Sequence, residues 1–365
     1  MPKRNAIYGA GTYGTHFYNA INKECKIDFF IDQFINVKKV LGVPVYRLAE
    51  ISDPQDVILY VSVPQIQEYC DRGAYDLIAD LKTYNFRSIF DFVGSINKYP
   101  EILKNFISVE ALWMRKTASE MLDFKSLAIV ENLLCDDQSK DLLSQIMRFR
   151  KTMVPENYIM PDGQIEYFPQ DIDVFNGIDK LRFVDAGAYN GDTISELFTN
   201  CTSPPVEYIA CFEPENNNIK DINSKISALA QYVKETKIFI FPLGVWSENR
   251  LLPFTGSKDT GKFVGENPTQ QYTKKIPVCS LDSVLSGAAP NFIKMDIEGA
   301  EHHGLKGAYD IIARHRPTLA ICVYHQPSDL WSIPCYINRE FPGYKFFLRQ
   351  HGHIGLSTIL YCLPV

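Results

Sequence analysis

One stretch, residues 183–193 (FVDAGAYNGDT), constrains the fold of this chain more than any other. A short apolar run ends on Asp185, and two glycines, Gly187 and Gly191, follow before a helix is expected to start. A buried strand, a glycine turn and a helix form the nucleotide-type binding corner of many α/β folds. Asp185 and Asp192 bracket this turn, and two carboxylates would repel a pyrophosphate. The stretch therefore favours S-adenosylmethionine (SAM), which carries an ammonium and a sulfonium, over NAD.

Composition and charge narrow the function classes. The 365 residues suggest two or three domains, and a net charge of −6 argues against nonspecific binding to nucleic acid. No apolar run reaches the roughly 18–20 residues of a membrane span, and the basic start leads into a glycine turn, so no signal peptide is expected. The nine cysteines include no C-x-x-C pair, which is typical of free thiols in a reducing compartment. We expect a cytoplasmic protein.

Residues 1–95 are predicted to form a small Rossmann-like α/β domain. A short strand leads into Gly9–Gly14, a G-x-G-x-x-G motif, and a helix follows. The next strand ends on Asp32, about 20 residues on, where a dinucleotide-binding fold places its ribose-binding carboxylate. Two interpretations stay open: a site for a nucleotide or nucleotide-sugar, or a scaffold that binds nothing and only docks.

This first segment also resembles a known type of domain. The residues that carry the resemblance are Tyr8–Gly14, Phe30–Asp32 and Leu41–Val45. On these residues it is similar to the N-terminal Rossmann-like domain of bacterial sugar-modifying enzymes, such as the sugar acyltransferases of polysaccharide pathways. The resemblance implies a nucleotide or nucleotide-sugar ligand at most.

Residues 96–178 are predicted to be a helical connector followed by a loop. Apolar residues recur at helical spacing, for example Ile102 with Phe106 and Leu142 with Ile146. The later part is rich in turn residues, and Tyr167–Pro169 could form a flap over the cofactor loop. Ordinary packing is the alternative for that segment.

Residues 179–365 are predicted to form a doubly wound sheet. Apolar runs predict seven strands, at Arg182–Ala186, Tyr208–Phe212, Lys237–Leu243, Asn291–Met295, Thr318–Tyr324, Lys345–Arg349 and Thr358–Cys362. The first five alternate with helical or loop connections, as a mostly parallel sheet requires. The last two are separated by a short segment and can pair only as an antiparallel hairpin. The predicted fold is therefore a seven-stranded mixed sheet with an antiparallel edge hairpin.

Two further features belong with the glycine corner, which we define as Asp185–Thr193. Glu213 ends the second strand of the sheet, where a carboxylate can accept both hydroxyls of a ribose; capping of a helix opened by Pro214 is the alternative. Gly244 and Val245 follow the third strand, where a small-residue turn would let the backbone approach an adenine ring. Tight packing explains Gly244 equally well.

The run from Phe292 to Glu301 carries the candidate catalytic groups. Asp296 and Glu298 follow a buried strand at the carboxyl edge of the sheet, and His325 comes just after the next strand. His325 or Glu298 is the predicted general base, with Asp296 orienting it. A packing or capping role is the alternative for His325. A divalent ion held by Asp296, Glu298, His302 and His325 is a second route, but no tight ligand spacing such as H-E-x-x-H is present, so no metal is predicted.

Taken together, these motifs resemble one family over about residues 165–365. The matching segments, in chain order, are Asp185–Thr193, the Glu213 strand, Ser280–Asp282, Lys294–Glu301, Arg316–Pro317, Tyr324–His325, Asp329–Trp331 and Thr358–Tyr361. They are similar to the FkbM family of SAM-dependent methyltransferases. The resemblance implies a class I methyltransferase fold, SAM as methyl donor and a hydroxyl oxygen as acceptor. The predicted cofactor-binding residues are Asp185, Gly187, Tyr189, Gly191, Asp192, Thr193, Glu213, Gly244, Val245 and Asp296.

The resulting functional prediction is an O-methyltransferase for a hydroxyl of a sugar, nucleotide-sugar or polysaccharide precursor. A non-catalytic nucleotide-sugar binding module and a metal-assisted methyltransferase are the alternatives. A pyridine-nucleotide oxidoreductase using Gly9–Gly14 is disfavoured, because the first 95 residues offer no acid–base pair for hydride transfer. Neither the acceptor nor the oligomeric state follows from the sequence.

Overall fold

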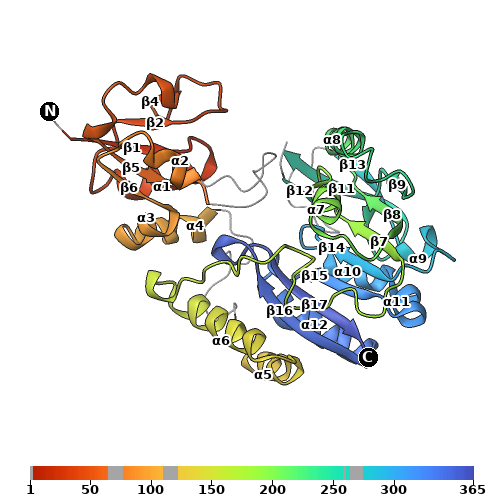
Figure 1. Cartoon of the computed structure of the whole chain (residues 1–365). Coiled ribbons are helices and arrows are strands. Elements are labelled where there is room, and N and C mark those ends of the chain that lie inside the picture. The colour runs from red at the N-terminus through yellow and green to blue at the C-terminus, as the bar shows by residue number, and fades with distance from the viewer. Residues whose placement is uncertain (1–2, 65–76, 110–121, 258–259, 264–273) are drawn as a thin grey trace. The chain divides into compact units, whose positions relative to one another are not determined.

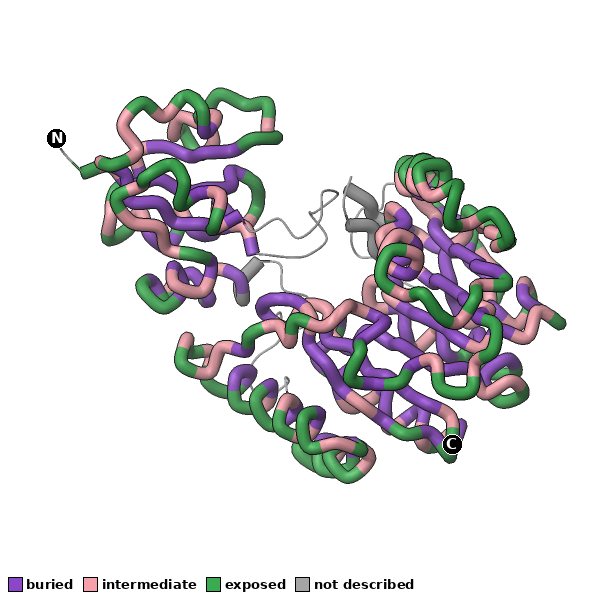
Figure 2. The backbone as a smooth tube through the Cα atoms, viewed as in Figure 1, coloured by how far each residue is buried: buried purple, intermediate pink, exposed green. Residues whose placement is uncertain are grey.

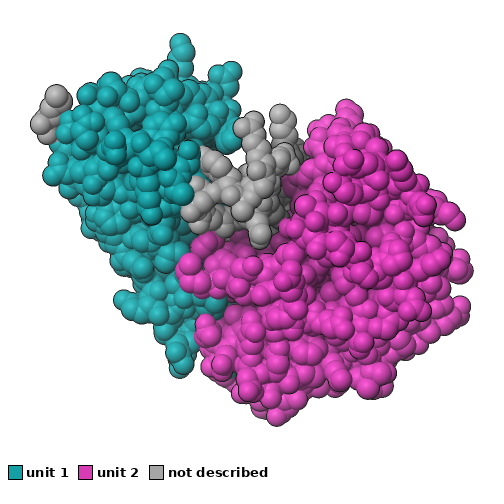
Figure 3. Space-filling view, viewed as in Figure 1, with its two compact units in different colours: residues 1–119, 147–159 teal, residues 120–146, 160–365 magenta. Residues whose placement is uncertain are grey.

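The chain folds into two compact units (Figures 1 and 3). The computed structural model describes residues 3–64, 77–109, 122–257, 260–263 and 274–365. The first unit comprises residues 1–119 and 147–159, and the second comprises residues 120–146 and 160–365. The segment 96–178, predicted as a connector, thus contributes residues to both units.

The first unit is built on a six-stranded sheet of order β3-β4-β2-β1-β5-β6. Its strands are β1 (Arg4–Tyr8), β2 (Phe29–Ile31), β3 (Lys39–Val40), β4 (Val43–Tyr46), β5 (Val57–Val61) and β6 (Ser88–Phe90). All neighbouring strands are parallel except β3 and β4. Every residue of β5 is buried, as expected of a central parallel strand covered on both faces.

Aromatic side chains join the helices of this unit to one another. The helices are α1 (Thr12–Ile21), α2 (Leu77–Lys82), α3 (Phe92–Lys98) and α4 (Glu101–Val109). Phe106 of α4 lies against Tyr13 and Phe17 of α1, with ring centroids 5.2 and 6.3 Å apart. This contact assigns α4 to the first unit, because its apolar face is buried on α1.

The second unit is built on a seven-stranded sheet of order β16-β17-β15-β14-β7-β8-β9. Its strands are β7 (Leu181–Ala186), β8 (Val206–Phe212), β9 (Lys237–Phe241), β14 (Phe292–Met295), β15 (Thr318–Cys322), β16 (Tyr344–Gln350) and β17 (Thr358–Pro364). The strands from β15 to β9 run parallel, and β16 and β17 form an antiparallel hairpin. The predicted mixed sheet with an edge hairpin is confirmed, and its central strands are buried (Figure 2).

Helices accompany this sheet. They are α7 (Asp192–Asn200), α8 (Asn216–Ala228), α9 (Leu281–Val284), α10 (Glu301–Gly307), α11 (Tyr309–His315) and α12 (Asp329–Glu340). One core cluster joins Phe183 of β7 and Ile209 of β8 to Ile194 of α7 and Ile222 of α8. Tyr167 and other residues that precede β7 belong to the same cluster, so the segment before the sheet is part of its core.

A second, four-stranded sheet in this unit was not predicted. Its order is β10-β13-β11-β12, with β10 (Gly244–Val245), β11 (Arg250–Ser257), β12 (Thr260–Phe263) and β13 (Lys274–Cys279). The long paired strands β11 and β13 each contain a proline, Pro253 and Pro277. Proline removes a ladder donor and argues against a strand in a sequence pattern, which explains why these strands were missed.

Helices α5 (Phe124–Leu133) and α6 (Asp137–Thr152) precede the main sheet in the chain. Helix α5 packs against α12, and the backbone N–H of Cys135 donates to the carbonyl oxygen of Phe346 on the edge strand β16 (2.9 Å). The junction between α5 and α6 thus pairs with part of a strand edge that would otherwise be open.

Candidate active site

Three neighbouring strands end at the same level of the main sheet. Ala186 of β7 is paired with Phe212 of β8 on one side and with Met295 of β14 on the other. The next residue of each strand, Gly187, Glu213 and Asp296, therefore leaves the sheet at the same edge. This register brings the predicted cofactor corner, ribose-binding carboxylate and catalytic carboxylate together.

The glycine corner is held by its own backbone. The N–H groups of Gly187 and Ala188 both donate to the carbonyl oxygen of Phe212 (3.0 and 3.1 Å). Gly187 has φ +80°, and a Cβ there would lie 1.8 Å from the carbonyl oxygen of Asp296, so no other residue fits. Gly191 is also left-handed, with φ +83°, and caps helix α7. Tyr189 lies between the two glycines at φ +44° and is partly exposed.

Asp185 lies beneath the corner and is completely excluded from solvent. Its carboxylate is 2.9 Å from Nζ of Lys294, which also donates to the carbonyl oxygen of Gly187 (2.6 Å). Burial raises the pKa of Asp185 to about 6, although Lys294 opposes that shift. Burial alone would lower the pKa of Lys294, but Asp185 and Asp296 outweigh it and raise that pKa.

Lys294, the partner of Asp185, changes the charge of the corner from what the sequence predicts. Because Lys294 neutralises Asp185, the two carboxylates around the corner do not act as an unpaired anionic pair. Asp192 accepts a hydrogen bond from the N–H of Thr193 (2.8 Å) at the start of α7, where a carboxylate is favourable. Sequence reasoning missed the role of Lys294, although a single lysine inside the apolar run of β14 was a visible signal.

Glu213 connects the corner to the next loop. Its carboxylate accepts from the N–H of Glu215 (2.8 Å), from the N–H of Tyr189 and from the side chain of Asn218. Burial raises the pKa of Glu213 to about 7, although these hydrogen bonds oppose the shift. The contact with Glu215 is local but is not the predicted helix cap, because α8 starts at Asn216 with Glu215 as its N-cap and no side chain capping it. The contact with Tyr189 is the one that fixes Glu213 beside the corner.

Gly244 and Val245 lie in strand β10 of the second sheet, where both residues are buried. They are paired in parallel with Val278 and Cys279 of β13. Their surroundings support the packing role, and their predicted approach to an adenine ring stays a prediction.

A cluster of titratable groups surrounds His325, which is almost completely buried. Its Nδ1 lies 3.0 Å from Glu301 Oε1, and its Nε2 lies 3.2 Å from Asp296 Oδ1 and 3.9 Å from Glu298 Oε2. Burial alone would lower the pKa of His325, but Glu301 and Asp296 outweigh it and raise the pKa well above 6.5. The imidazole is therefore held as a cation between two carboxylates.

Asp296 is the centre of this cluster. Tyr167 Oη donates to its Oδ2 (2.9 Å), and Tyr324 Oη lies 3.3 Å from its Oδ1. Burial would raise the pKa of Asp296, but the contacts with His325, Lys294 and Tyr167 lower it. The carboxylate thus stays ionised and is oriented from several sides. Tyr167 and Tyr324 were not among the predicted site residues, because no local pattern connects them to Asp296.

Glu298 lies in the turn between β14 and helix α10. The residues after β14 form a turn rather than an extended or helical segment, Glu298 has φ +58°, and helix α10 starts only at Glu301. Its side chain keeps 33% of its exposure, whereas that of His325 keeps 1%. Glu298 and Asp296, whose side chain keeps 23%, are therefore the members of the predicted catalytic set that a bound molecule can reach.

The histidine predicted as a possible metal ligand, His302, lies outside the cluster, because its Nε2 is 2.7 Å from Ser332 Oγ. Asp296, Glu301 and His325 instead offer ligand atoms within 4.8 Å of one another, a set that could hold a divalent ion. A metal would have to displace the proton of His325, since a ligating histidine must be neutral.

The N-terminal G-x-G-x-x-G motif has a structural explanation. A Cβ on Gly14 would lie 2.0 Å from the carbonyl oxygen of Gly9, so the turn requires glycine. Asp32 accepts from the N–H groups of Ala10 (2.8 Å), Phe34 (2.8 Å) and Ile35 (2.9 Å). Both oxygens of the predicted ribose-binding carboxylate are thus used by the chain itself, which favours the scaffold interpretation of this unit.

Among the residues that the structure describes, no helix combines the length and the apolar character needed to cross a bilayer.

A glycine corner and an acid-ended second strand on a mixed sheet with an antiparallel edge hairpin define a Rossmann-like fold with a nucleotide-type site at the carboxyl edge. A family model for the methyltransferase FkbM domain matches residues 185–354. The chain therefore carries an FkbM methyltransferase domain and is a methyltransferase. The alternative of a non-catalytic binding module is set aside.

A solved structure shows a similar fold. The crystal structure of a methyltransferase FkbM from Methylobacillus flagellatus KT is similar, with a TM-score of 0.63 and 22% identity over 99% of this chain and 90% of that one. An rRNA methylase from Streptococcus thermophilus matches at a TM-score of 0.32 and 16% identity, covering 51% of this chain and 87% of that one. The search of curated proteins gives no match.

Proposed function

We propose that the chain is a SAM-dependent O-methyltransferase that acts on a hydroxyl of a sugar, nucleotide-sugar or polysaccharide precursor. The shared edge of β7, β8 and β14 carries the proposal, because it gathers the glycine corner, Glu213 and the Asp296 cluster. SAM, when bound, supplies a methyl group already activated by its sulfonium. The carboxylates at this edge outnumber Lys294 and His325, so the edge suits a ligand that carries positive charge.

In this proposal, Glu213 accepts the ribose hydroxyls and the corner backbone holds the rest of the donor. Glu213 is placed for this role by its hydrogen bond from the N–H of Tyr189. Asp185 acts from beneath the corner: it anchors Lys294, which holds the carbonyl oxygen of Gly187. We therefore assign Asp185 to positioning the loop rather than to direct contact with the donor.

Glu298 is the general base that the geometry favours. It accepts the proton of the acceptor hydroxyl while the oxygen gains the methyl group. His325 is already protonated between Asp296 and Glu301, so it cannot take this proton. The Asp296 carboxylate is a poor base, because its pKa is lowered and its oxygens are hydrogen-bonded. His325 and Asp296 thus orient the base and the acceptor.

The donor site is tested by the variant Glu213→Gln. We expect SAM affinity to fall about 10–100-fold, since hydrogen bonds to a charged group are lost. Because the pKa of Glu213 is raised to about 7 and the ionised form accepts hydrogen bonds, wild-type affinity should rise from about pH 6 to about pH 8. That rise should vanish in the variant. Calorimetry measures both effects.

The control for this test is Glu207→Gln, at the exposed start of the same strand β8. It should bind SAM like the wild-type protein. Unchanged affinity and an unchanged pH profile in Glu213→Gln would remove Glu213 from the donor site.

The base is tested by Glu298→Gln with methyl-labelled SAM and a panel of nucleotide-sugars and glycan precursors as acceptors. We expect kcat to fall about 10²–10⁴-fold with SAM affinity retained, as for the loss of a general base. Glu248→Gln, an exposed residue, should keep full activity. If the wild-type protein binds SAM and labels none of these hydroxyl acceptors, the substrate class is wrong. If it labels them and Glu298→Gln keeps full kcat, Glu298 is not the base.

A further inference from the structure

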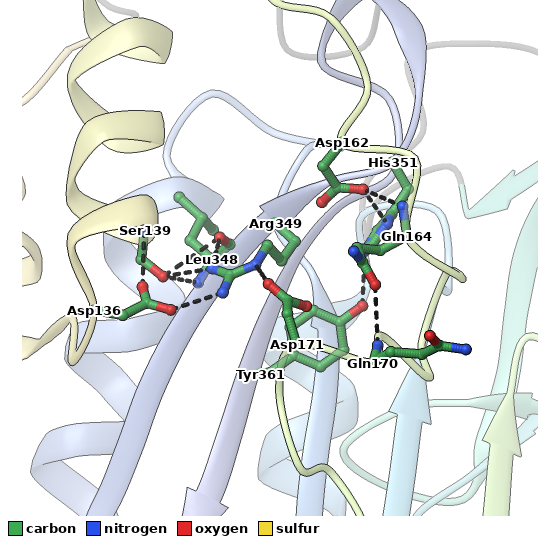
Figure 4. A network of polar contacts seen from close by, with 10 residues as sticks. All are labelled: Asp136, Ser139, Asp162, Gln164, Gln170, Asp171, Leu348, Arg349, His351 and Tyr361. Carbon is green, nitrogen blue, oxygen red and sulfur yellow. Dashed lines mark hydrogen bonds and ion pairs between the residues drawn. The ribbon is translucent and has the colours of Figure 1, made fainter.

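Residues Asp162–Asp171, here called the strap, are fastened to the β16–β17 hairpin at both ends (Figure 4). At one end, the Asp162 carboxylate lies 3.0 Å from Nδ1 of His351. The N–H of Asp162 also donates to the carbonyl oxygen of Gln350 (2.9 Å). At the other end, Nε of Arg349 donates to Asp171 Oδ2 (2.7 Å). These contacts hold both ends of the strap against the β16–β17 hairpin, so the strap is not a free flap.

The middle of the strap is held by a buried tyrosine of β17. Tyr361 Oη accepts from the N–H of Tyr167 (3.2 Å), and its other partner is Nε2 of His351 at 2.8 Å. Tyr167 has φ +65°, a left-handed conformation that is unfavourable for a residue other than glycine. The bond to Tyr361 helps to hold this unfavourable backbone in place.

The left-handed backbone conformation of Tyr167 directs its phenol toward Asp296. The residue is buried, and its Oη donates to Asp296 Oδ2 (2.9 Å). Burial raises the pKa of this phenol well above 10, so it is a permanent donor. Asp296 in turn contacts Nε2 of His325 through its other oxygen. A chain of contacts thus runs from His351 through Tyr361 and Tyr167 to the Asp296–His325 pair.

We propose that Tyr167 is a positioning residue for methyl transfer, and that His351 and Tyr361 hold its phenol on Asp296. The inference rests on the proposed function of the Asp296 cluster and adds the residues that position this cluster from behind the first contacts. The competing explanation is that Tyr167 merely fills the core, where it packs with Phe168 and other residues.

The test is Tyr167→Phe in the full chain, which removes one oxygen and keeps the ring. We expect kcat to fall about 10–100-fold, since a hydrogen bond to a charged group is lost, with KM for SAM nearly unchanged. Tyr361→Phe should lower kcat less. The double variant should be no slower than Tyr167→Phe alone, because both changes act through one phenol.

Tyr344→Phe is the matched control. Tyr344 is also a buried tyrosine of the hairpin, but its Oη donates to the carbonyl oxygen of Pro317 (2.8 Å), away from Asp296. It should keep wild-type kcat. The proposal is overturned if Tyr167→Phe loses no more kcat than Tyr344→Phe, or if the effects of Tyr167→Phe and Tyr361→Phe simply multiply.

A second measurement separates this proposal from the proposed function. In protein labelled on histidine, the ring resonances of His325 are assigned with His325→Gln and compared between variants. They should move in Tyr167→Phe and Tyr361→Phe and stay in place in Tyr344→Phe. If they move as expected while the wild-type protein methylates no hydroxyl, the positioning role stands and the acceptor assignment fails. Unmoved resonances in Tyr167→Phe overturn the positioning role.

Discussion

Gly187 shows how a single residue sets the geometry of the site. Its φ of +80° and the approach of the Asp296 carbonyl oxygen leave no room for a side chain. Gly163 is also left-handed, with φ +73°, but a Cβ there would meet nothing within 4 Å. The two glycines therefore separate the cost of backbone strain from the cost of a steric clash.

Replacing each with alanine tests this difference. Gly163→Ala should cost about 1–2 kcal/mol, the price of a left-handed alanine. Gly187→Ala should cost about 2–5 kcal/mol, because the clash forces a further shift of the packed backbone. Urea unfolding measures both, and SAM binding should be lost only in Gly187→Ala. Equal destabilisation by the two changes would contradict the steric argument.

At the residue scale, the sequence predicts a functional role where that role depends on neighbouring positions in the chain. The corner, Glu213, Asp296 and Glu298 were predicted as site residues because each follows an apolar run at the edge of the sheet. Lys294, Tyr167 and Glu301 were not found, because their roles depend on contacts made in space. Tyr167 reaches Asp296 across 129 positions of the chain, and only the folded structure brings them together.

At the scale of elements, Arg349 joins three segments of the second unit (Figure 4). Its guanidinium donates to Asp136 Oδ2 (2.7 Å), to Asp171 Oδ2 (2.7 Å) and to Ser139 Oγ (2.9 Å). The side chain of Arg349 is 2% exposed, whereas the two carboxylates keep 31% and 27%. Strand β16 is thereby tied to the strap and to the junction of α5 and α6.

We expect Arg349→Met to destabilise the chain by about 1–3 kcal/mol. Loss of one partner of a fully buried pair costs about 3–5 kcal/mol, but water partly solvates these two carboxylates and reduces that cost. Arg339→Met, at an exposed pair with Glu340, should change stability by less than about 0.5 kcal/mol. Urea unfolding at neutral pH compares them, and equal effects would contradict the role of Arg349.

The same pair predicts a dependence on pH. Burial would raise the pKa of Asp136, but Arg349 and Ser139 lower it. A carboxyl with a lowered folded-state pKa adds stability above its unfolded value, about pH 4, and this is lost as pH falls through the folded value. The difference between wild type and Arg349→Met should therefore shrink below about pH 4. A constant difference would mean that Asp136 does not contribute.

Whole elements were predictable to different degrees. The strands of the main sheet follow apolar runs, so the mostly parallel sheet and its final hairpin were predicted, but the order of the strands was not. The second sheet escaped prediction because two of its strands contain proline. The strap was predicted as a loop with a possible flap, and its attachment to β16 and β17 could not be read from a pattern that is local.

At the scale of the whole molecule, the chain contains two Rossmann-like units, each with a glycine turn after its first strand. The carboxylates near these two turns have different surroundings. In the first unit, Asp32 accepts from the N–H of Ala10 in the glycine turn and from the N–H groups of Phe34 and Ile35 in its own loop. In the second, Glu213 and the Asp296 cluster meet at the edge of the sheet. The likeness to the Methylobacillus flagellatus protein spans 99% of the chain, so the fold it shows covers both units.

The position of β17 has a consequence for how the protein is made. This strand follows all the others in the chain, yet it lies between β15 and β16 and pairs with both. During synthesis, β16 emerges before the neighbour that joins it to the sheet, and one side of β15 stays open until then. Tyr361, which holds the strap, arrives with the same strand. The second unit therefore completes its main sheet late in synthesis, and until then it exposes strand edges that chaperones would have to shield.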